Sequence, residues 1–201
     1  MKRIIVSFLL ICLVSFSFQA KSLDYSTDPE KFIEEIVDEA KSILNSSVSK
    51  EEKAEKLSVI ALKTVDVKGI GYYTLGKKRK EITPDQLKKY EELFQKYFLK
   101  TFTSRLTDYS DPKIAVVSAE KTSEKYTIVK TMLLKTDKKP EVKIDWRVYT
   151  KDPNKPLIRD LIIEGLSLAR TQKEEFSSIL NSNDGDINVL FKTLQAFSNN
   201  S

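Results

Sequence analysis

Two acidic residues in one short segment are the side chains best placed to do chemistry. Asp160 and Glu164 lie on a predicted strand that runs into Gly165, and their even spacing places both on one side of that strand. Four residues of extended chain would separate the two carboxylates by roughly 13 Å. The carboxylate pairs of glycosidases lie about 5–9.5 Å apart. The spacing therefore favours a structural role, in which Glu164 pairs with a lysine or caps backbone amides at the turn.

Other groups that commonly do chemistry are scarce. The chain has no histidine, and its one cysteine, Cys12, lies in the apolar N-terminal segment. The rest of the chain therefore offers no imidazole base, no thiolate nucleophile and no ordinary zinc site. Catalysis would depend on carboxylates, hydroxyl groups or lysines, so the composition favours a non-enzymatic protein. We expect no metal and no cofactor.

The first twenty residues are typical of a secretory signal peptide. Lys2 and Arg3 precede an apolar run over residues 4–18, and Ala20 is a small residue at the predicted cleavage point. The run is shorter than the roughly 20 residues of a membrane span. We predict a single domain over residues 21–201, without a disulfide. Loss of Lys2 and Arg3 lowers the net charge from +5 to +3, which fits weak attraction to anionic lipid better than nucleic-acid binding.

Apolar spacing and capping patterns predict helices on both sides of a β-rich middle. The expected helices cover residues 29–44, 50–64, 67–75, 84–107, 167–180 and 186–197. The expected strands cover residues 113–119, 126–135, 142–149 and 157–163, with polar turns at 121–124, 136–140 and 151–156. Because these connections are short, neighbouring strands should be antiparallel. The predicted fold is α+β, with a four-stranded antiparallel sheet and about six helices against one face or end.

The longest predicted helix carries an apolar stripe wider than docking on a sheet requires. Its aromatic members are Tyr90, Phe94, Tyr97, Phe98, Phe102 and Tyr109. An ordinary core helix is the commoner explanation, and a wall of an apolar cavity is the sharper hypothesis. In segment 142–149 the side chains of Ile144, Trp146 and Val148 share one face, as expected of a half-buried strand. Segment 126–135 is largely apolar on both faces, which either two-sided covering or an internal space would explain.

A run of four cations follows the third predicted helix: Lys77, Lys78, Arg79 and Lys80. Such a run can dock on anionic lipid headgroups or on an acidic partner surface. The alternative is a solvated loop without a partner.

Two blocks of the sequence carry a family pattern. The first block consists of Asp160, Ile163, Glu164, Gly165, Ser167 and Leu168, followed by Phe176. The second consists of Leu75 and Gly76, then residues 83–86, then Tyr90, Phe94, Phe102 and Leu106. Together they resemble the MlaC family of periplasmic phospholipid carriers, and the resemblance covers essentially the whole predicted mature chain.

The resemblance implies a function. Members of that family bind phospholipid by its acyl chains between sheet and helices, around an apolar cavity. They carry it between an outer-membrane lipoprotein/porin complex and an inner-membrane ABC transporter complex, which maintains lipid asymmetry of the outer membrane. The chain would then be a monomer in the periplasm of a Gram-negative bacterium, with no nucleic acid partner. The residues expected to contact acyl chains, with plain core packing as the alternative for each, are Phe94, Phe98, Phe102, Val129, Leu133, Ile144, Trp146, Val148, Ile162, Leu166 and Leu168.

Two other classes of protein remain open. One is an enzyme with a cone-shaped α+β fold that uses Asp160, Asp145 or a tyrosine for proton transfer. The other is a periplasmic adaptor whose apolar face binds another protein. An exposed face would cause oligomerisation, whereas an internal cavity would leave a monomer that carries lipid.

Overall fold

The structure is a computed structural model that describes residues 25–107, 113–135 and 140–199. The predicted signal peptide, Tyr109 and most of the predicted turn at 136–140 lie outside these residues. The predicted α+β class is confirmed: the described residues form six α-helices, one 3-10 helix and one antiparallel sheet. The helices are α1 (Pro29–Leu44), α2 (Lys50–Thr64), α3 (Val67–Leu75), the 3-10 helix η1 (Gly76–Lys80), α4 (Pro84–Leu106), α5 (Leu168–Asn181) and α6 (Ile187–Asn199).

The sheet is a meander with the strands side by side in chain order. Its strands are β1 (Ile114–Ser123), β2 (Tyr126–Leu133), β3 (Val142–Tyr149), β4 (Leu157–Ile163) and β5 (Leu166–Ser167). Two details differ from the sequence prediction. Most of the turn predicted at 121–124 belongs to β1, and Ser123 pairs with Tyr126 across a two-residue turn. The fifth strand, β5, follows another two-residue turn, in which Glu164 and Gly165 both have positive φ, as hairpin turns of this length favour.

Capping side chains fix the helix starts where the sequence predicts them. Asp28 accepts hydrogen bonds from the backbone N–H groups of the first turn of α1, and Ser49 does the same for α2. Thr83 and Gln86 form a reciprocal capping box at the start of α4. Ser167 caps α5 by accepting from the Arg170 N–H. Each cap satisfies backbone donors that the first helical turn leaves without a partner.

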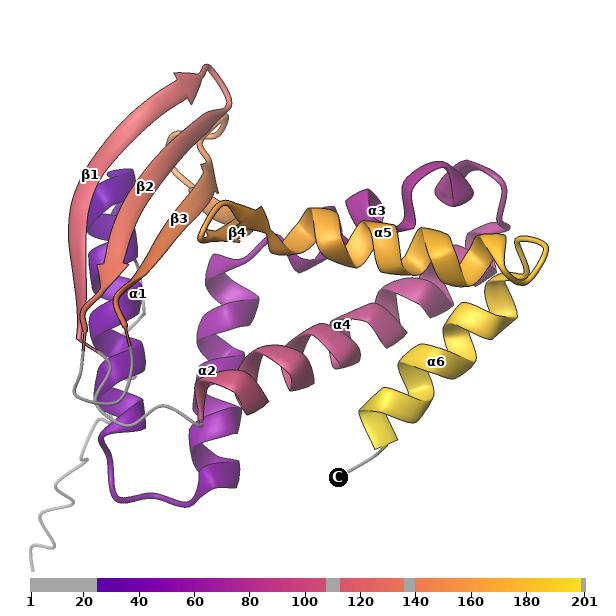
Figure 1. The fold of residues 1–201 in the computed structure, drawn as a ribbon, viewed down its shortest axis with the longest axis horizontal. Helices are drawn as coiled ribbons and strands as arrows, with labels where there is room; N and C mark the ends of the chain where they lie inside the picture. The colour runs from indigo at the N-terminus through magenta and orange to yellow at the C-terminus, as the bar shows by residue number, and fades with distance from the viewer. Residues whose placement is uncertain (1–24, 108–112, 136–139, 200–201) are drawn as a thin grey trace, which may run out of the picture.

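Two apolar cores hold the molecule together. The first lies between one face of the sheet and α1 and α2, and includes Phe32, Ile33, Leu57, Val129 and Val148. The second lies among α3, α4, α5 and α6, and includes Tyr90, Phe94, Phe176, Leu190 and Leu194. Figure 1 shows the sheet and α1 at one end of the molecule and α5 and α6 at the other.

The two cores meet where α2 passes into α3. Val65 forms a parallel bridge with Ile158 of β4, and the Asp66 N–H donates to the Ile158 carbonyl. The Arg159 guanidinium lies 2.7 Å from the Asp66 carboxylate. Helix α4 spans the same division, because it packs against α2, α3 and α6. None of the helices in the described ranges is long and apolar enough to cross a bilayer.

Candidate functional site

The aromatic stripe of α4 divides into a buried part and a partly exposed part. Tyr90 and Phe94 are buried in the core among α3, α5 and α6. One and two turns further along, Phe98 and Phe102 are only partly buried, and their rings stack with centroids 6.0 Å apart. The Phe94 and Phe98 centroids are 6.2 Å apart, so the three rings form a continuous row. The second half of this row therefore keeps apolar surface in contact with solvent, at a cost that a bound apolar molecule would remove.

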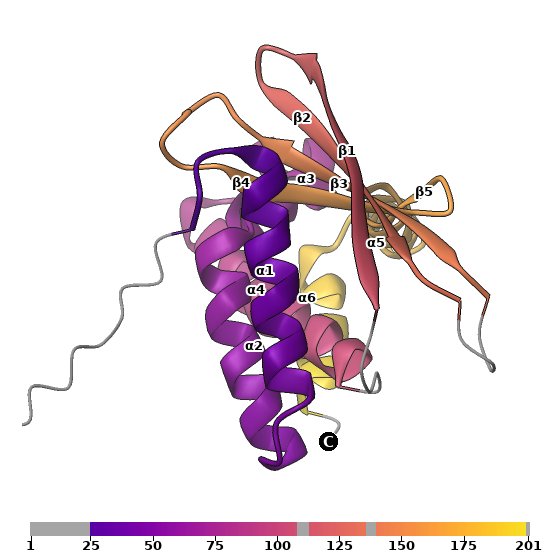
Figure 2. The same cartoon turned by 90° about the vertical axis from the view of Figure 1, so that its left-hand side faces the viewer.

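The inner face of the sheet shows the same division. Val129 and Val148 are completely buried under α1. The register of β2 and β3 places Leu133, Ile144 and Trp146 on the same face as these two valines. All three are partly exposed. Figure 2 shows that the end of the sheet formed by the last residues of β2 and the first residues of β3 extends beyond α1. We use the name apolar strip for two sets of partly exposed apolar side chains, Leu133, Ile144 and Trp146 on the sheet and Phe98 and Phe102 on α4.

Hydrogen bonds fix the indole of Trp146 at this face. Its Nε1–H donates to Thr131 Oγ1 over 2.9 Å, and the Thr131 hydroxyl donates to the Ile144 carbonyl over 3.0 Å. Thr131 is itself buried. Because the only polar atom of the indole is satisfied from within the sheet, the rest of the ring is an apolar surface.

The other predicted contact residues do not belong to the apolar strip. Phe94, Val129 and Val148 belong to the two cores. Ile162 pairs with Asp145, on the face opposite Trp146, while Leu161 pairs with Trp146 itself. Leu161 and Ile163, which the sequence reasoning missed, thus share the face of the strip. Leu166 is 58% exposed in β5, and Leu168 is partly buried at the start of α5.

Two surface depressions lie away from these residues. One follows α2 and is lined mainly by charged side chains, among them Glu52, Glu55 and Lys56. The other lies between Tyr73 of α3 and the polar side of α5. Neither depression is lined by a residue of the apolar strip.

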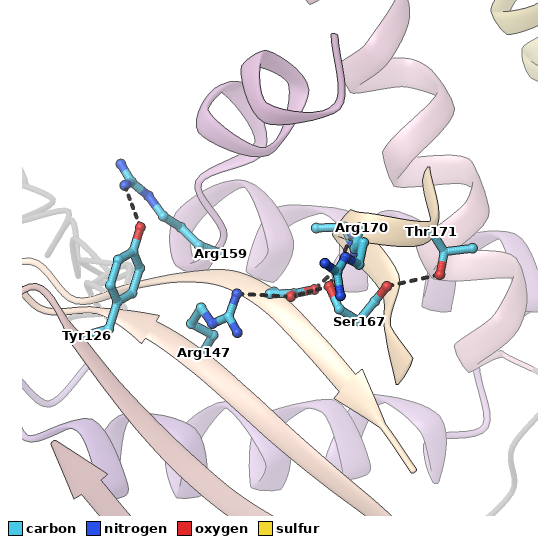
Figure 3. Close-up of polar contacts among 8 residues, drawn as sticks. Tyr126, Arg147, Arg159, Ser167, Arg170 and Thr171 are labelled. Atoms are coloured by element: carbon cyan, nitrogen blue, oxygen red, sulfur yellow. Dashed lines mark hydrogen bonds and ion pairs between the residues drawn. The ribbon is translucent and has the colours of Figure 1, made fainter. Parts of the chain in front are cut away.

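The carboxylate of Asp160 is a buried structural centre. Its Oδ2 accepts from the Ser167 hydroxyl at 2.6 Å, and its Oδ1 accepts from the Ala169 N–H at 3.0 Å. Arg147 Nη1 lies 3.5 Å from Oδ2. Arg147 and Ser167, the two labelled side chains that contact this carboxylate, are shown in Figure 3. Asp160 thus joins β4 to the first turn of α5, where a negative charge is favoured by the helix dipole.

Glu164 also has a structural role, as the spacing of the two carboxylates predicted. Its Oε1 accepts from the Lys143 backbone N–H at 2.5 Å. It therefore binds a backbone amide beside the β4–β5 turn. In the described part of the chain, no group of three or more Cys, Asp or Glu side chains is arranged to hold a metal ion.

Arg159 forms a second polar centre, at the junction of the two cores. Its guanidinium donates to Asp66 and to the Tyr126 hydroxyl (Figure 3), and it lies 3.6 Å from the centroid of the Tyr149 ring. Burial works to lower the pKa of Arg159, but the hydrogen bonds to Tyr126 and Asp66 outweigh it and raise that pKa. The sequence analysis did not find this group. The only signal in the sequence is an aspartate, Asp66, just before the third predicted helix. In the structure the Asp66 side chain caps α3 by accepting from the Gly69 N–H.

The four cations Lys77, Lys78, Arg79 and Lys80 all lie on η1, at the end of the molecule away from the sheet (Figure 1). Lys78 is partly buried and pairs with Glu81 at 3.2 Å, and the other three are exposed. η1 begins at Gly76, whose φ of 60° is a conformation that glycine adopts without strain. The predicted run is therefore a compact turn that follows α3 directly.

Glu91 of α4, which contacts two side chains of α3, offers a test by pH. The Tyr72 hydroxyl donates to the Glu91 carboxylate and Lys68 pairs with it at 3.0 Å, and these contacts lower the pKa of Glu91. An acid whose pKa is lowered by folding stabilises the fold above its unfolded pKa, and that contribution is lost as pH falls through the folded pKa. We expect Tyr72→Phe to raise the pKa of Glu91 toward its ordinary value. A carboxyl-carbon NMR titration measures this, and an unchanged Glu91 titration would contradict the assigned hydrogen bond.

The sequence matches a known protein family, and the fold matches a solved structure. The model of the family described as MlaC protein matches residues 34–196. A solved structure of a phospholipid-binding protein from Ralstonia solanacearum, in complex with a phospholipid, superposes with a TM-score of 0.72 at 18% sequence identity, over 84% of this chain and 96% of that chain. No curated protein matches the sequence.

The chain belongs to the MlaC family, as the sequence resemblance predicted, because the family model covers most of its length. The likeness to the solved structure establishes the fold.

Proposed function

We propose that the chain is a phospholipid carrier that binds acyl chains along the apolar strip. The observation that supports this most is that Phe98 and Phe102 on α4 and Trp146 on the sheet keep apolar surface exposed while nearby core residues are buried completely. Membership of the MlaC family and the phospholipid in the similar Ralstonia protein also support it. The headgroup would lie toward solvent.

The energetics of phospholipid explain why such a carrier needs no catalytic group. Each buried methylene is worth about 0.8 kcal/mol, so two long acyl chains in water would cost roughly 20 kcal/mol or more. A lipid therefore crosses an aqueous space only when a protein covers its chains. We propose that this chain acts as a monomer in the periplasm, between an outer-membrane complex and an inner-membrane ABC transporter complex, as its family membership suggests.

The enzyme alternative loses its main candidate. An enzyme that used Asp160 for proton transfer would need a substrate to reach its carboxylate. Asp160 is 4% exposed, and both of its oxygens accept hydrogen bonds from Ser167 and Ala169. The carrier proposal is the one that the partly exposed apolar side chains support.

The test is the lipid content of the purified protein and of a charged variant. Protein purified without detergent should release phospholipid on extraction, seen by mass spectrometry. Phe102→Asp should lower that content about tenfold or more, because a carboxylate beside acyl chains costs several kcal/mol. Leu62→Asp is the matched control, because Leu62 is a 48% exposed apolar residue of α2 that does not belong to the strip.

A second variant guards against misfolding. Ile144→Asp changes the sheet side of the strip and should have the same effect as Phe102→Asp. Circular dichroism would establish that both variants are folded. Wild-type protein free of phospholipid, or folded variants that retain it, would refute the carrier proposal.

A further inference from the structure

The end of the molecule that carries η1 has a cluster of cations, and Gly185, between Asp184 and Asp186, lies beside Lys78 there. Three of its cations are paired with carboxylates, in the pairs Lys68–Glu91, Lys78–Glu81 and Arg170–Glu174. Four others, Lys77, Arg79, Lys80 and Lys173, form no ion pair with a carboxylate among the described residues. We call these four cations, with Tyr72 and Tyr73, the basic end. Cations that the protein does not pair with its own carboxylates are available to a partner of opposite charge.

Contacts with the two tyrosines orient part of this charge. The Arg79 guanidinium lies 4.9 Å from the centroid of the Tyr72 ring, and the Lys173 ammonium lies 4.9 Å from that of Tyr73. The Tyr72 hydroxyl is held in turn by Glu91. Cations that rest on aromatic rings lose less conformational freedom when a partner binds them. The basic end is thus better ordered than a solvated loop of lysines.

A surface depression adjoins these cations. It is lined by Tyr73, Arg170, Lys173 and Glu174, and further along α5 by Ser177, Ser178, Asn181 and Ser182. Tyr73 is 46% exposed. Its hydroxyl groups and cations can donate hydrogen bonds to the carboxylates of another chain, and Tyr73 and Arg170 are of residue types enriched at protein interfaces.

We infer that the basic end docks an acidic surface of a partner protein. A bilayer fits less well, for two reasons. Segments that bind membranes combine cations with inserted Leu, Phe or Trp side chains, and Tyr73 is the one large hydrophobic residue at this end that is strongly exposed in the described structure. The basic end also lies away from the sheet (Figure 1), so a bilayer bound there would not face the apolar strip. A partner protein bound there would leave the strip free.

The experiment compares two double charge reversals. Lys77→Glu/Lys80→Glu changes two exposed cations of the basic end. Lys121→Glu/Lys125→Glu changes two exposed lysines beside the β1–β2 turn, at the other end of the molecule, and alters the net charge equally. The probes are a fluorescent peptide of ten glutamates, followed by anisotropy at low and physiological salt, and vesicles with one quarter phosphatidylglycerol in phosphatidylcholine, followed by flotation.

We expect the first pair of substitutions to weaken peptide binding about tenfold or more, and the second pair to change it less than about twofold, because docking depends on where the charge lies. Equal weakening by both pairs would mean that binding follows total charge, and would overturn the inference. In another outcome, only the first pair of substitutions abolishes vesicle binding, and peptide binding is unchanged. That result would identify a bilayer as the partner and would also overturn the inference. Lipid content should match the wild type in both variants, so a failure of the carrier proposal would be seen separately.

Discussion

Replacing Asp160 with alanine is expected to lower the free energy of unfolding by about 3 kcal/mol. The carboxylate is buried and is shared by Ser167, Ala169 and Arg147. Its removal leaves the buried Ala169 N–H without an acceptor and takes the negative charge from the first turn of α5. Arg147 is 43% exposed, so water compensates for most of its lost contact.

Thermal unfolding followed by circular dichroism would measure this effect. For a chain of this size, 3 kcal/mol lowers the melting temperature by roughly 6–12 °C. Asp145→Ala is the control, since Asp145 is a partly buried aspartate on the neighbouring strand. Asp160→Asn should have an intermediate effect, because it keeps an oxygen acceptor and loses the charge. A melting temperature within a degree of the wild type for Asp160→Ala would show that Asp160 does not hold α5 to the sheet.

Removal of bound phospholipid is expected to destabilise the protein by a similar amount. This prediction depends on the carrier proposal. A ligand that binds only the folded state stabilises it by about 2.7 kcal/mol at one hundred times its Kd and about 4.1 kcal/mol at one thousand times. We therefore expect the stripped protein to melt roughly 5–16 °C below the protein as purified. Scanning calorimetry before and after lipid extraction, and after return of phospholipid, measures the difference.

The Phe102→Asp variant is the control for this measurement. Because it should carry little lipid from the start, extraction should change its melting temperature by less than about 2 °C, in line with a site that is seldom occupied. Should the wild type melt at one temperature with and without extraction, the lipid found in it would not be bound to the folded state.

The helices could be predicted closely from the sequence because their signals are local. Asp28, Ser49, Thr83 and Ser167 cap helices whose starts the sequence predicts to within one residue. The strands were harder. The end of β1 carries polar residues because it is exposed on both faces, so the sequence predicts a turn over residues 121–124, although Lys121 and Ser123 pair with β2. The short β5 forms because the turn at Glu164 and Gly165 brings Leu166 and Ser167 back alongside β4.

The candidate site could be predicted only in part, because long-range pairing decides which side chains meet. The alternation in β3 correctly placed Ile144, Trp146 and Val148 on one face. Ile162 was expected to join them, but β4 pairs with β3 in a register that shifts at Arg147, and this places Leu161 opposite Trp146 instead. Nor could the sequence show which half of the α4 stripe is buried, because α3, α5 and α6 cover only the first half.

The register shifts in β1 have a consequence for how copies of the chain behave in solution. β1 is a terminal strand of the sheet, and its pairing with β2 is irregular after Val116 and again after Lys121. Such bulges interrupt the even row of outward N–H and C=O groups that a neighbouring molecule would need to pair with the edge of the sheet. At the opposite border, β5 is only two residues long. Both borders of the sheet therefore discourage aggregation, although Val117 is 63% exposed on β1.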